Sequence, residues 1–515
     1  MNTQNTSQTR HCHLPLRIFR RKTRLYLLLP LLCMTGSALL FAQPATLRRA
    51  LTLERVVTDA RKNSLNAQIA ENSYIASYWQ YLIYKADRYP TLSLRSTPVQ
   101  YYQNFVKRYN SQNDIDIYKQ QKNFYSSFGI QAQQKIRATG GTLYAETDLD
   151  YLRSFGADKS TQFSSVPFRI GYSQELFGFN AYKWSQKTKP LRFEKARCQL
   201  IYEFENVSAQ AVRNFFTYAL CCKNVELAQA NVARCDTAFQ IAQERQQLGN
   251  VTQADVLTLQ LNLLNARKEL NTAQTALEQS GKTLAAFLRY EGETDFDITL
   301  PHPDTHLLIS PDDAVRMAKT ANPKLKELEL QRLSAEQNLR QAEKSRFSTS
   351  LSVSVGFNQA AETFLYAYRH PLRQDMVSVS LRIPIVDWGA NKAKVAVAKS
   401  NLSTAQISIQ QEMESFEQSV YFAIREYNDS YAQIGLAEEA LHIAQLAYDA
   451  TYERFLIGKA NVDALNMAQN RQSEAQRSYI NALSTYWANY YEVRKYTLYD
   501  FAKKESITVD VESLR

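Results

Sequence analysis

Hydrophobic and polar residues alternate one by one in four stretches of this 515-residue chain, namely 124–136, 143–151, 351–357 and 377–383. In the third stretch, for example, single serines separate Leu351, Val353 and Val355. A period of two with one apolar face predicts half-buried strands, or barrel strands with one face in lipid. The alternation alone does not separate a membrane barrel from a soluble sandwich, because both show it.

Between the alternating stretches the chain predicts unusually long helices. About 65 residues separate Tyr182 from Leu248 without a glycine, and Pro190 is the one helix breaker among them. A helix of this length measures roughly 90–100 Å. Farther along, apolar or small residues recur every seven positions in two sets: Val256, Leu263, Leu270, Leu277 and Leu284, then Leu259, Ala266, Ala273, Ser280 and Phe287. Two such sets are typical of a helix that packs as a coiled coil.

The two halves of the chain repeat this layout. Arg245 and Gly249 mark a turn after the first long helical run, and Arg454 and Gly458 mark a turn after the second. The separation is 209 residues in both cases, from 245 to 454 and from 249 to 458. A strand, a very long helix, a turn with glycine and a returning helix thus occur twice, which predicts an internally duplicated strand–long-helix fold.

The first half is longer before its long helices. A helical segment from residue 51 to about 89 precedes its strands, and Arg88 matches Arg346 at a separation of 258 residues, 49 more than 209. We expect the extra residues to form a polar, Tyr-rich loop at 100–123 and an added hairpin that turns at 139–142. The predicted domains are a first repeat at 43–300, a linker at 301–309, a second repeat at 310–502 and a C-terminal tail at 503–515.

Residues 1–42 have the layout of a signal peptide for secretion. A basic cluster precedes an apolar run that begins at Leu25, and Ala42 offers a cleavage site before Gln43. A transmembrane anchor is the alternative. The formal charge of +11 includes six basic and no acidic residues before Gln43, so the mature chain carries about +5, which is weak evidence for nucleic-acid binding. No later stretch reaches the ~18 apolar residues of a membrane helix, so entry into a membrane after export would have to use strands.

The sequence holds no constellation typical of catalysis. Gly281-Lys-Thr lacks the upstream glycine of a phosphate-binding loop. The four cysteines after residue 42 lack the spacing of a metal site. His302 and His306 flank a short Pro-rich link, where solvent-exposed side chains are expected. We therefore predict no enzyme, no cofactor, no metal and no nucleic-acid partner.

Together these features resemble the TolC family of outer-membrane efflux proteins, the outer membrane factors, over essentially the whole mature chain. The residues that carry the resemblance are Leu51-Thr-Leu-Glu, 86–94, 173–178, 381–389, the two turns and 490–500. The resemblance implies a mainly α fold with a β-barrel portion: a homotrimer in which each protomer gives four strands to one outer-membrane barrel, continued by a periplasmic α-helical barrel. Physics agrees, because a few strands from one chain cannot close a barrel and lipid does not tolerate an open sheet edge.

The same resemblance implies a function. A member of this family would be a passive exit duct that lies in the lipid of the outer membrane and extends into the periplasm. It would join a periplasmic adaptor (membrane fusion) protein and an inner-membrane pump to export small molecules. The outer-membrane duct of a type I protein secretion system is one alternative. A secreted periplasmic coiled-coil scaffold is another, and it would need the alternating strands to be soluble.

The family meets its adaptor at the turns between the long helices. The residues that match this docking motif are Arg245, Leu248 and Gly249 in the first turn, with Arg454, Ile457 and Gly458 in the second. The alternative is that each glycine only ends its helix in a left-handed conformation.

The family's acidic gate follows the second turn. Asp463 matches it, and three copies would form a carboxylate ring, which favours cations. The second acidic position is Asn466 here, while Asp255 remains in the other turn. The tyrosine and the arginine of the family's lock correspond to Phe455 and Ala460, so we expect the closed state to be held differently. A plain surface role for Asp463 stays open.

Overall fold

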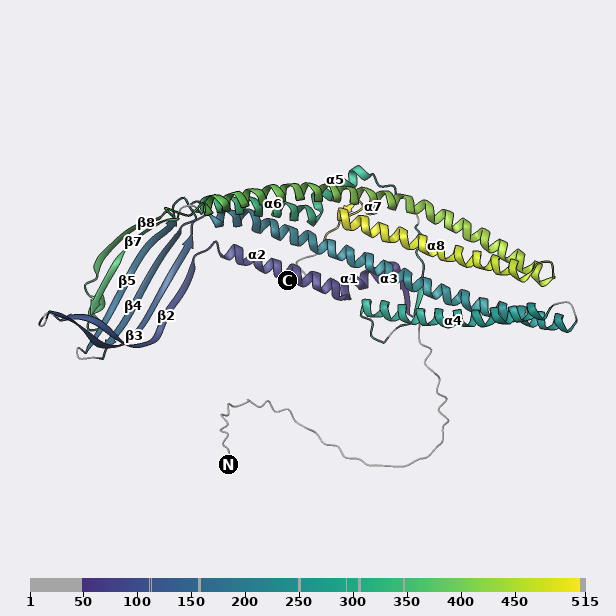
Figure 1. Ribbon diagram of the computed structural model, residues 1–515, viewed down its shortest axis with the longest axis horizontal. Coiled ribbons are helices and arrows are strands. Elements are labelled where there is room, and N and C mark those ends of the chain that lie inside the picture. Colours follow the sequence, from purple (N-terminus) through teal and green to yellow (C-terminus); the bar gives the residue numbers. More distant parts are fainter. Residues whose placement is uncertain are drawn as a thin grey trace, which may run out of the picture. The chain divides into compact units, whose positions relative to one another are not determined.

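The computed structural model describes residues 49–110, 112, 114–155, 159–248, 252–292, 294–303, 307–345 and 348–509. The predicted signal at 1–42 and Gly249 of the first turn lie outside these residues. The described part of the chain contains eight α-helices and one six-stranded sheet (Figure 1).

The helices come in two matching sets. The first set is α1 (Leu53–Asn63), α2 (Leu65–Ala86), α3 (Ala181–Gln247) and α4 (Gln253–Leu288). The second set is α5 (Pro311–Ala321), α6 (Pro323–Lys344), α7 (Ala390–Leu456) and α8 (Val462–Thr497). Both have lengths of 11, 22, 67 and 36 residues. The short helices are shifted by 258 residues, from 53 to 311, and the long ones by 209, from 181 to 390, which confirms the internal duplication.

Polar caps decide where the short helices end. The sequence predicts one helical segment from residue 51 to about 89, but Ser64 interrupts it, because its hydroxyl accepts a hydrogen bond from the Ala67 N–H and starts α2. Asn322 acts in the same way between α5 and α6, where its side chain accepts from the Lys324 N–H. A side-chain oxygen that satisfies a free N–H group at a helix start fixes that start.

One antiparallel sheet joins the two repeats, with the strand order β2–β3–β4–β5–β7–β8. The strands are β2 (Thr91–Asn110), β3 (Ile115–Lys135), β4 (Thr142–Ser154), β5 (Ser160–Glu175), β7 (Ser348–Ala361) and β8 (Leu372–Arg382). The added hairpin predicted around 139–142 is the connection between β3 and β4. The expectation of four strands in each protomer is wrong, because this sheet has six in the described residues.

The prediction of a polar loop at 100–123 is also wrong. These residues belong to β2 and β3, which stay paired out to Asn110 and Ile115. Tyr101, Phe105 and Tyr118 are exposed there, so no buried apolar face marked the strands in the sequence. The available signal was the run of aromatic and β-branched residues, which favour strands even where they stay exposed.

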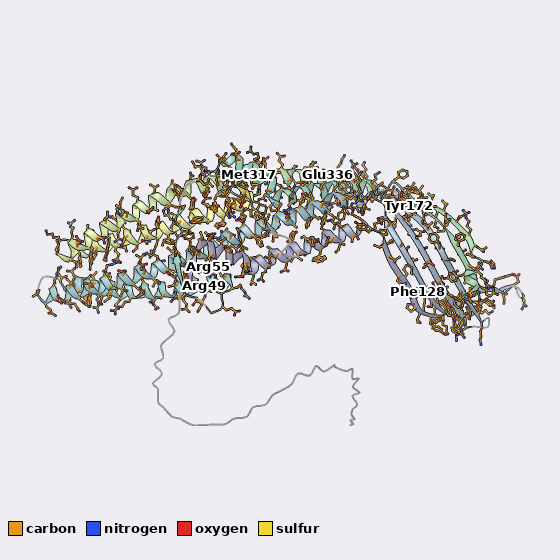
Figure 2. The ribbon with its side chains drawn as sticks, turned by 180° about the vertical axis from the view of Figure 1, so that it is seen from behind. Arg49, Arg55, Phe128, Tyr172, Met317 and Glu336 are labelled. Atoms are coloured by element: carbon orange, nitrogen blue, oxygen red, sulfur yellow. The ribbon has the colours of Figure 1, made fainter. Side chains whose placement is uncertain are left out.

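The two faces of the sheet differ in polarity. On one face the partners across β4, β5, β7 and β8 are Leu143, Tyr172, Val353 and Val377. In the next row, on the opposite face, they are Thr142, Ser173, Ser352 and Ser378. Phe128 and Tyr172 can be followed in Figure 2 as two of the sheet's side chains. Because successive strand residues point to opposite faces, the period-two pattern of the sequence becomes one apolar and one polar surface.

The long helices form two hairpins. α3 packs against α4, α7 packs against α8, and α3 also packs against α8. All ten heptad positions predicted in α4 are buried or partly buried, while most residues between them are exposed, which confirms the coiled-coil packing. Among the described residues, no helix has both the length and the apolar character needed to cross a bilayer.

The main hydrophobic core lies where α1 and α5 cover the long helices, and it includes Phe215, Tyr218, Ile424 and Leu483. Short elements close this region: β1 (Arg49–Thr52) pairs in parallel with β6 (Phe296–Thr299), and β9 (Tyr499–Asp500) pairs with β10 (Glu505–Ser506). The 3₁₀ helix η1 (Tyr366–Tyr368) lies between β7 and β8.

Candidate functional site

The candidate residues gather at the two turns where the long helices reverse. In the first turn Leu248 is the C-cap of α3 and Thr252 is the N-cap of α4. In the second turn Ile457 is the C-cap of α7 and Asn461 is the N-cap of α8. Because each N-cap side chain satisfies a backbone N–H locally, the helix starts are stable without any outside partner.

Gly458 ends α7 in the left-handed conformation, with φ of 77°. The N–H of Lys459 donates to the carbonyl oxygen of Arg454 at 2.8 Å, and the N–H of Gly458 donates to that of Phe455 at 3.0 Å. These bonds satisfy carbonyl groups that the helix end leaves free. Gly458 therefore has the helix-ending role that was the alternative to docking.

That role does not account for the side chains beside the glycine. Leu248 is 75% exposed and Ile457 is 67% exposed, and Arg454 is exposed next to them. Neither apolar side chain is needed to end its helix. Among the described residues, Leu248 and Ile457 therefore each present a large apolar side chain to solvent, at matching positions of the two repeats.

The two turns are joined to each other, which the sequence did not predict. The Arg245 guanidinium in α3 donates from Nη2 to the carbonyl oxygen of Leu456 at 3.4 Å. A small apolar core, here called the turn cluster, lies beside this bond. Its buried members are Ala238, Ala242, Val256, Leu259, Tyr448, Phe455 and Leu465. They come from α3, α4, α7 and α8, so the cluster ties both hairpins together near their turns.

The three predicted gate residues have different surroundings. Asp255 is the third residue of α4, and its Oδ2 accepts from the Thr252 N–H at 3.3 Å and from the Thr252 hydroxyl at 2.7 Å. This is a capping box, so the Asp255 carboxylate stabilises its own helix. Asp463 is the second residue of α8 and is exposed, and in the described part of the chain it forms no hydrogen bond or ion pair. Asn466, one turn farther along, is partly exposed.

The position of Asp463 explains why its carboxylate is available. Asn461 already caps α8, because its Oδ1 accepts from the Ala464 N–H at 2.9 Å. The positive end of the helix dipole stabilises a carboxylate in this first turn. Asp463 therefore lies in the first turn of α8 without being used by the cap.

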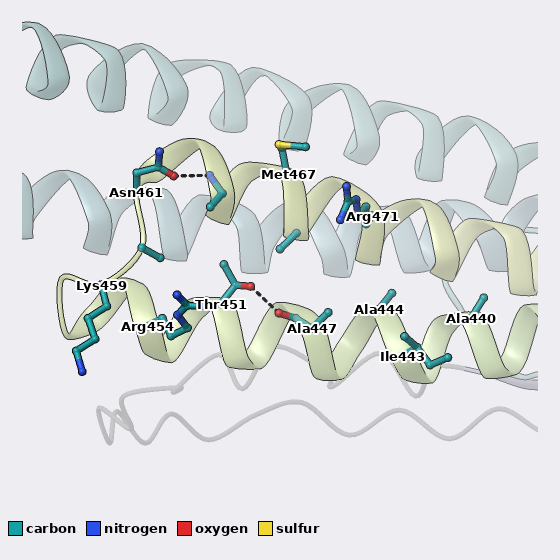
Figure 3. Close-up of a pocket in the computed structure, with 13 residues that line it drawn as sticks. Ala440, Ile443, Ala444, Ala447, Thr451, Arg454, Lys459, Asn461, Met467 and Arg471 are labelled. Carbon is teal, nitrogen blue, oxygen red and sulfur yellow. Dashed lines mark hydrogen bonds between the residues drawn. The ribbon is translucent and has the colours of Figure 1, made fainter.

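A groove of about 950 Å³ lies between α7 and α8 next to the second turn (Figure 3). Small residues line much of it: Ala440, Ala444, Ala447, Ala460, Ala464 and Ala468. Figure 3 also shows Ile443 and Met467, both more than half exposed, and the basic residues Arg454, Lys459 and Arg471 around it. Small side chains on facing helices leave room for a third helix, so the groove is a candidate contact surface.

Two of these features had a signal in the sequence. Thr252 followed three residues later by Asp255 is the spacing of a capping box. Ala440, Ala444 and Ala447 are spaced four and three apart, which places them on one helix face. The bond from Arg245 to Leu456 had none, because it depends on how α3 packs against the other hairpin.

Comparison with known proteins gives a family match. The family model described as outer membrane efflux protein matches residues 123–288 and 314–497, one segment in each repeat. The outer membrane efflux protein BepC of Brucella suis is 22% identical over 279 residues, which are 54% of this chain and 60% of BepC. The toxin and drug export protein A of Aggregatibacter actinomycetemcomitans is 21% identical over 61% of this chain and 69% of its own length.

A solved structure shares the fold over most of both chains. The outer membrane channel CmeC of Campylobacter jejuni aligns with a TM-score of 0.62 and 15% identity, covering 90% of this chain and 88% of CmeC. An alignment over 90% of this chain includes residues of the sheet and of both sets of helices, because neither the sheet nor one set of helices makes up that share of the chain.

Proposed function

We propose that this chain, which belongs to the outer membrane efflux protein family, is the passive exit duct of a tripartite efflux system. The family places it in the outer membrane with its helices in the periplasm. In the proposed system an adaptor docks at the helix turns, and an inner-membrane pump supplies the energy that exports small molecules. The proposed role is transport without catalysis by this chain.

The sheet carries this proposal. It has an apolar face, a serine-rich polar face and two open edges, β2 and β8. A barrel in lipid needs an apolar outside and closed edges, and its inside is polar where it holds water. The edges close if β8 of one copy pairs with β2 of the next, and the apolar face then forms the outside of the barrel. Such a pair is antiparallel, because β2 and β8 are the first and sixth strands of an antiparallel sheet and so run in opposite directions.

We propose a homotrimer, in which three copies of this sheet give eighteen strands. The helices offer a second surface for the same assembly. Leu257, Leu261 and Leu264 form an exposed stripe on α4, and each is more than half exposed. The groove between α7 and α8 begins at the second turn, beside Lys459 and Ala460, and continues along both helices. In the proposed trimer the leucines of a neighbour's α4 would pack against its alanines.

A second candidate is the outer-membrane duct of a type I protein secretion system. The relative named toxin and drug export protein A favours it, because that name includes a toxin as well as drugs among the exported substances. A secreted scaffold is disfavoured, because Leu92, Leu94, Val377 and Val379 would then face water with at least 62% of each side chain exposed.

If an adaptor docks at the turns, changing them should abolish export while the protein still reaches the outer membrane in normal amounts. The change is Leu248→Asp combined with Ile457→Asp, which puts charge on both exposed apolar groups. We expect a strain that carries only this variant to accumulate a fluorescent efflux dye as strongly as a strain without the gene. The control is Leu436→Asp, which alters an equally exposed leucine of α7 (68%) far from the turn. Normal export by the double variant, with normal amounts in the outer membrane, would argue against docking here.

The gate assignment predicts a change in ion selectivity. In a trimer three Asp463 carboxylates would lie at the narrow end of the duct and favour cations. We expect Asp463→Ala to lower the cation preference of single channels in planar bilayers, read from the reversal potential in a KCl gradient. Asp255→Ala is the matched control, because its carboxylate is bound in a capping box and its loss should affect helix stability instead. If Asp463→Ala and the unaltered protein have the same ion selectivity, Asp463 is not a gate residue and is an ordinary surface residue.

A further inference from the structure

We infer that the outside of the sheet, at the end away from the helices, binds a phosphorylated glycolipid of the lipopolysaccharide class. The binding surface, here called the rim patch, consists of Arg153 in β4, residues 364–369 around η1 and Arg373 in β8. This inference rests on the proposed function, because only a barrel whose apolar face meets lipid has an outer rim of this kind. It concerns the outside wall of the duct and not the path of the exported molecules.

The connections of the strands place the rim patch at the far end of the sheet. β5 leads into α3 and β8 leads into α7, so both strands begin at the end away from the helices. The connection from β7 to β8, which contains η1, lies at that end as well. With the helices in the periplasm, this end of the sheet lies in the outer leaflet of the membrane, where lipopolysaccharide is found.

The η1 segment folds onto the apolar face of the sheet. Ser165 of β5 lies opposite Leu149 of β4 on this face, and its hydroxyl donates to the carbonyl oxygen of Ala367 in η1. Ala367 is fully buried by this contact, whereas the neighbouring Leu365 is 75% exposed and Phe364 is 51% exposed. The segment thus adds large apolar side chains to the outside of the proposed barrel, at the level where acyl chains join their headgroup.

Within the described strands, charged residues share the apolar face only towards this end. Alternation carries the face from Leu143 to Arg153 in β4, and from Val377 to Asp375 and Arg373 in β8. The Arg373 guanidinium donates from Nε to the Asp375 carboxylate at 3.1 Å. In the part of the chain that the structure describes, its two terminal nitrogens form no hydrogen bond. The exposed arginines therefore mark the place where apolar surface gives way to headgroups.

Arginine side chains suit the phosphates of such a headgroup. A guanidinium group can donate two parallel hydrogen bonds to one phosphate. The Arg369 guanidinium lies 5.1 Å from the centre of the Tyr366 ring, and that of Arg153 lies 5.1 Å from the centre of the Phe155 ring. The attraction between cation and ring favours these positions. Both arginines are exposed, so they can still reach a ligand.

The spread of the arginines favours a large headgroup over a single phosphate. β4 and β8 are separated by β5 and β7, so Arg153 and Arg373 lie at least three strand spacings apart, about 14 Å. One phosphate cannot bridge this distance. The lipid part of lipopolysaccharide is a phosphorylated pair of sugars with several acyl chains. It therefore presents separate phosphates to the arginines and acyl chains to Phe364 and Leu365.

The test uses the full mature protein, purified as a trimer in mild detergent and freed of bound lipid. The probe is fluorescently labelled lipopolysaccharide with a short sugar chain, and fluorescence anisotropy measures its affinity. The variant replaces all three arginines of the rim patch: Arg153→Gln, Arg369→Gln and Arg373→Gln. We expect it to bind the probe at least about tenfold more weakly, because hydrogen bonds between charged groups are lost.

A matched control removes the same charge at the other end of the sheet. It replaces three exposed lysines near the starts of α3 and α7: Lys183→Gln, Lys392→Gln and Lys394→Gln. This variant should bind the probe like the unaltered protein, because its lysines face the periplasmic side of the membrane. An equal loss in both variants would show that net charge, and not the rim patch, attracts the lipid.

Two further comparisons separate a glycolipid site from a general anion site. Lipopolysaccharide treated with a phosphatase should bind at least about tenfold more weakly than the intact form. Neither phosphatidylglycerol nor inorganic phosphate should displace the probe as well as unlabelled lipopolysaccharide does. Leu365→Asp keeps all three arginines but puts a charge among the acyl chains, so it should weaken binding of the probe several-fold.

Three results would overturn the rim patch. The first is a triple arginine variant that binds like the unaltered protein, the second is an equal loss in the lysine control, and the third is full displacement of the probe by phosphatidylglycerol or phosphate. If the triple arginine variant fails to assemble, the three single changes decide, each with an expected several-fold loss. A failure of the proposed function looks different, because the unaltered protein would then form no trimer or export no dye.

Discussion

Replacing Arg494 by methionine is expected to lower the free energy of unfolding by about 3–5 kcal/mol, the cost of breaking a buried ion pair. Arg494 in α8 donates from Nε to the Glu205 carboxylate in α3 at 3.0 Å, and from Nη1 to the Asp500 carboxylate in β9 at 2.5 Å. Glu205 is fully buried and Asp500 is 4% exposed. Methionine fills much of the space but leaves Asp500 without Arg494, and it leaves Glu205 with Arg61, whose Nη2 lies 2.5 Å from Oε1.

The measurement is thermal unfolding in mild detergent, followed by the helical circular dichroism signal. Lys282→Met is the matched control: Lys282 pairs with Glu278 on the surface of α4, with both side chains 64% exposed, and such a pair contributes about 0–1 kcal/mol. The double change Arg494→Met with Glu205→Leu should recover only part of the loss. It removes one buried charge, but it leaves Asp500 without Arg494 and Arg61 without Glu205. If Arg494→Met and Lys282→Met behave alike, the cluster is not a stabilising element.

Acid should affect the same cluster. Burial alone would raise the pKa of Asp500, but Arg494 and the backbone N–H groups of Lys503 and Ala502 hold this pKa below its usual range. A carboxylate with a lowered pKa stabilises the fold above its unfolded-state pKa, and the contribution is lost as the pH falls through the folded-state value. The unaltered protein should therefore lose stability in acid, and Arg494→Met should lose less, because part of that contribution is already gone.

The repeat and the helices could be predicted because they depend on local periodicity. The heptad positions of α4 and the matching turns of Arg245 and Arg454 are visible within short windows of sequence. The strands at 100–123 were missed for a physical reason: a two-stranded extension exposed on both faces needs no apolar alternation. The strand count has another cause: the added hairpin that turns at 139–142 joins β3 to β4 within the same sheet, so it adds two strands to the four that the resemblance implies.

The candidate site was only partly predictable for a related reason. Caps and helix-ending glycines act within a few residues, so the positions of the turns followed from the sequence. The joining of the turns did not, because Arg245 and Leu456 are 211 residues apart and meet only through the packing of two hairpins. Glu205 and Arg494 are likewise far apart, at 289 residues, and neither lies in a recognisable motif. Long-range pairs between helices leave little trace in a single sequence.

The largest effect on assembly is expected from Val353→Arg. Val353 lies on the apolar face in the middle of β7, between Tyr172 of β5 and Val377 of β8. If this face meets lipid, an arginine near the middle of the membrane costs about 2–4 kcal/mol per protomer. Three copies in one barrel carry this cost three times. We expect the variant to be largely absent from the outer membrane fraction and to yield little trimer when sized in mild detergent.

The neighbouring residue supplies the control, because consecutive strand residues point to opposite faces. Ser352 has serine partners on both sides, Ser173 and Ser378, so the polar face has room for a long side chain there. Ser352→Arg should reach the outer membrane and form trimers in near-normal amounts, with the guanidinium in lumenal water. Equal loss of both variants would mean that bulk, and not lipid exposure, is the cause. Equal tolerance of both would contradict the barrel, since in a sheet surrounded by water neither face excludes a charge.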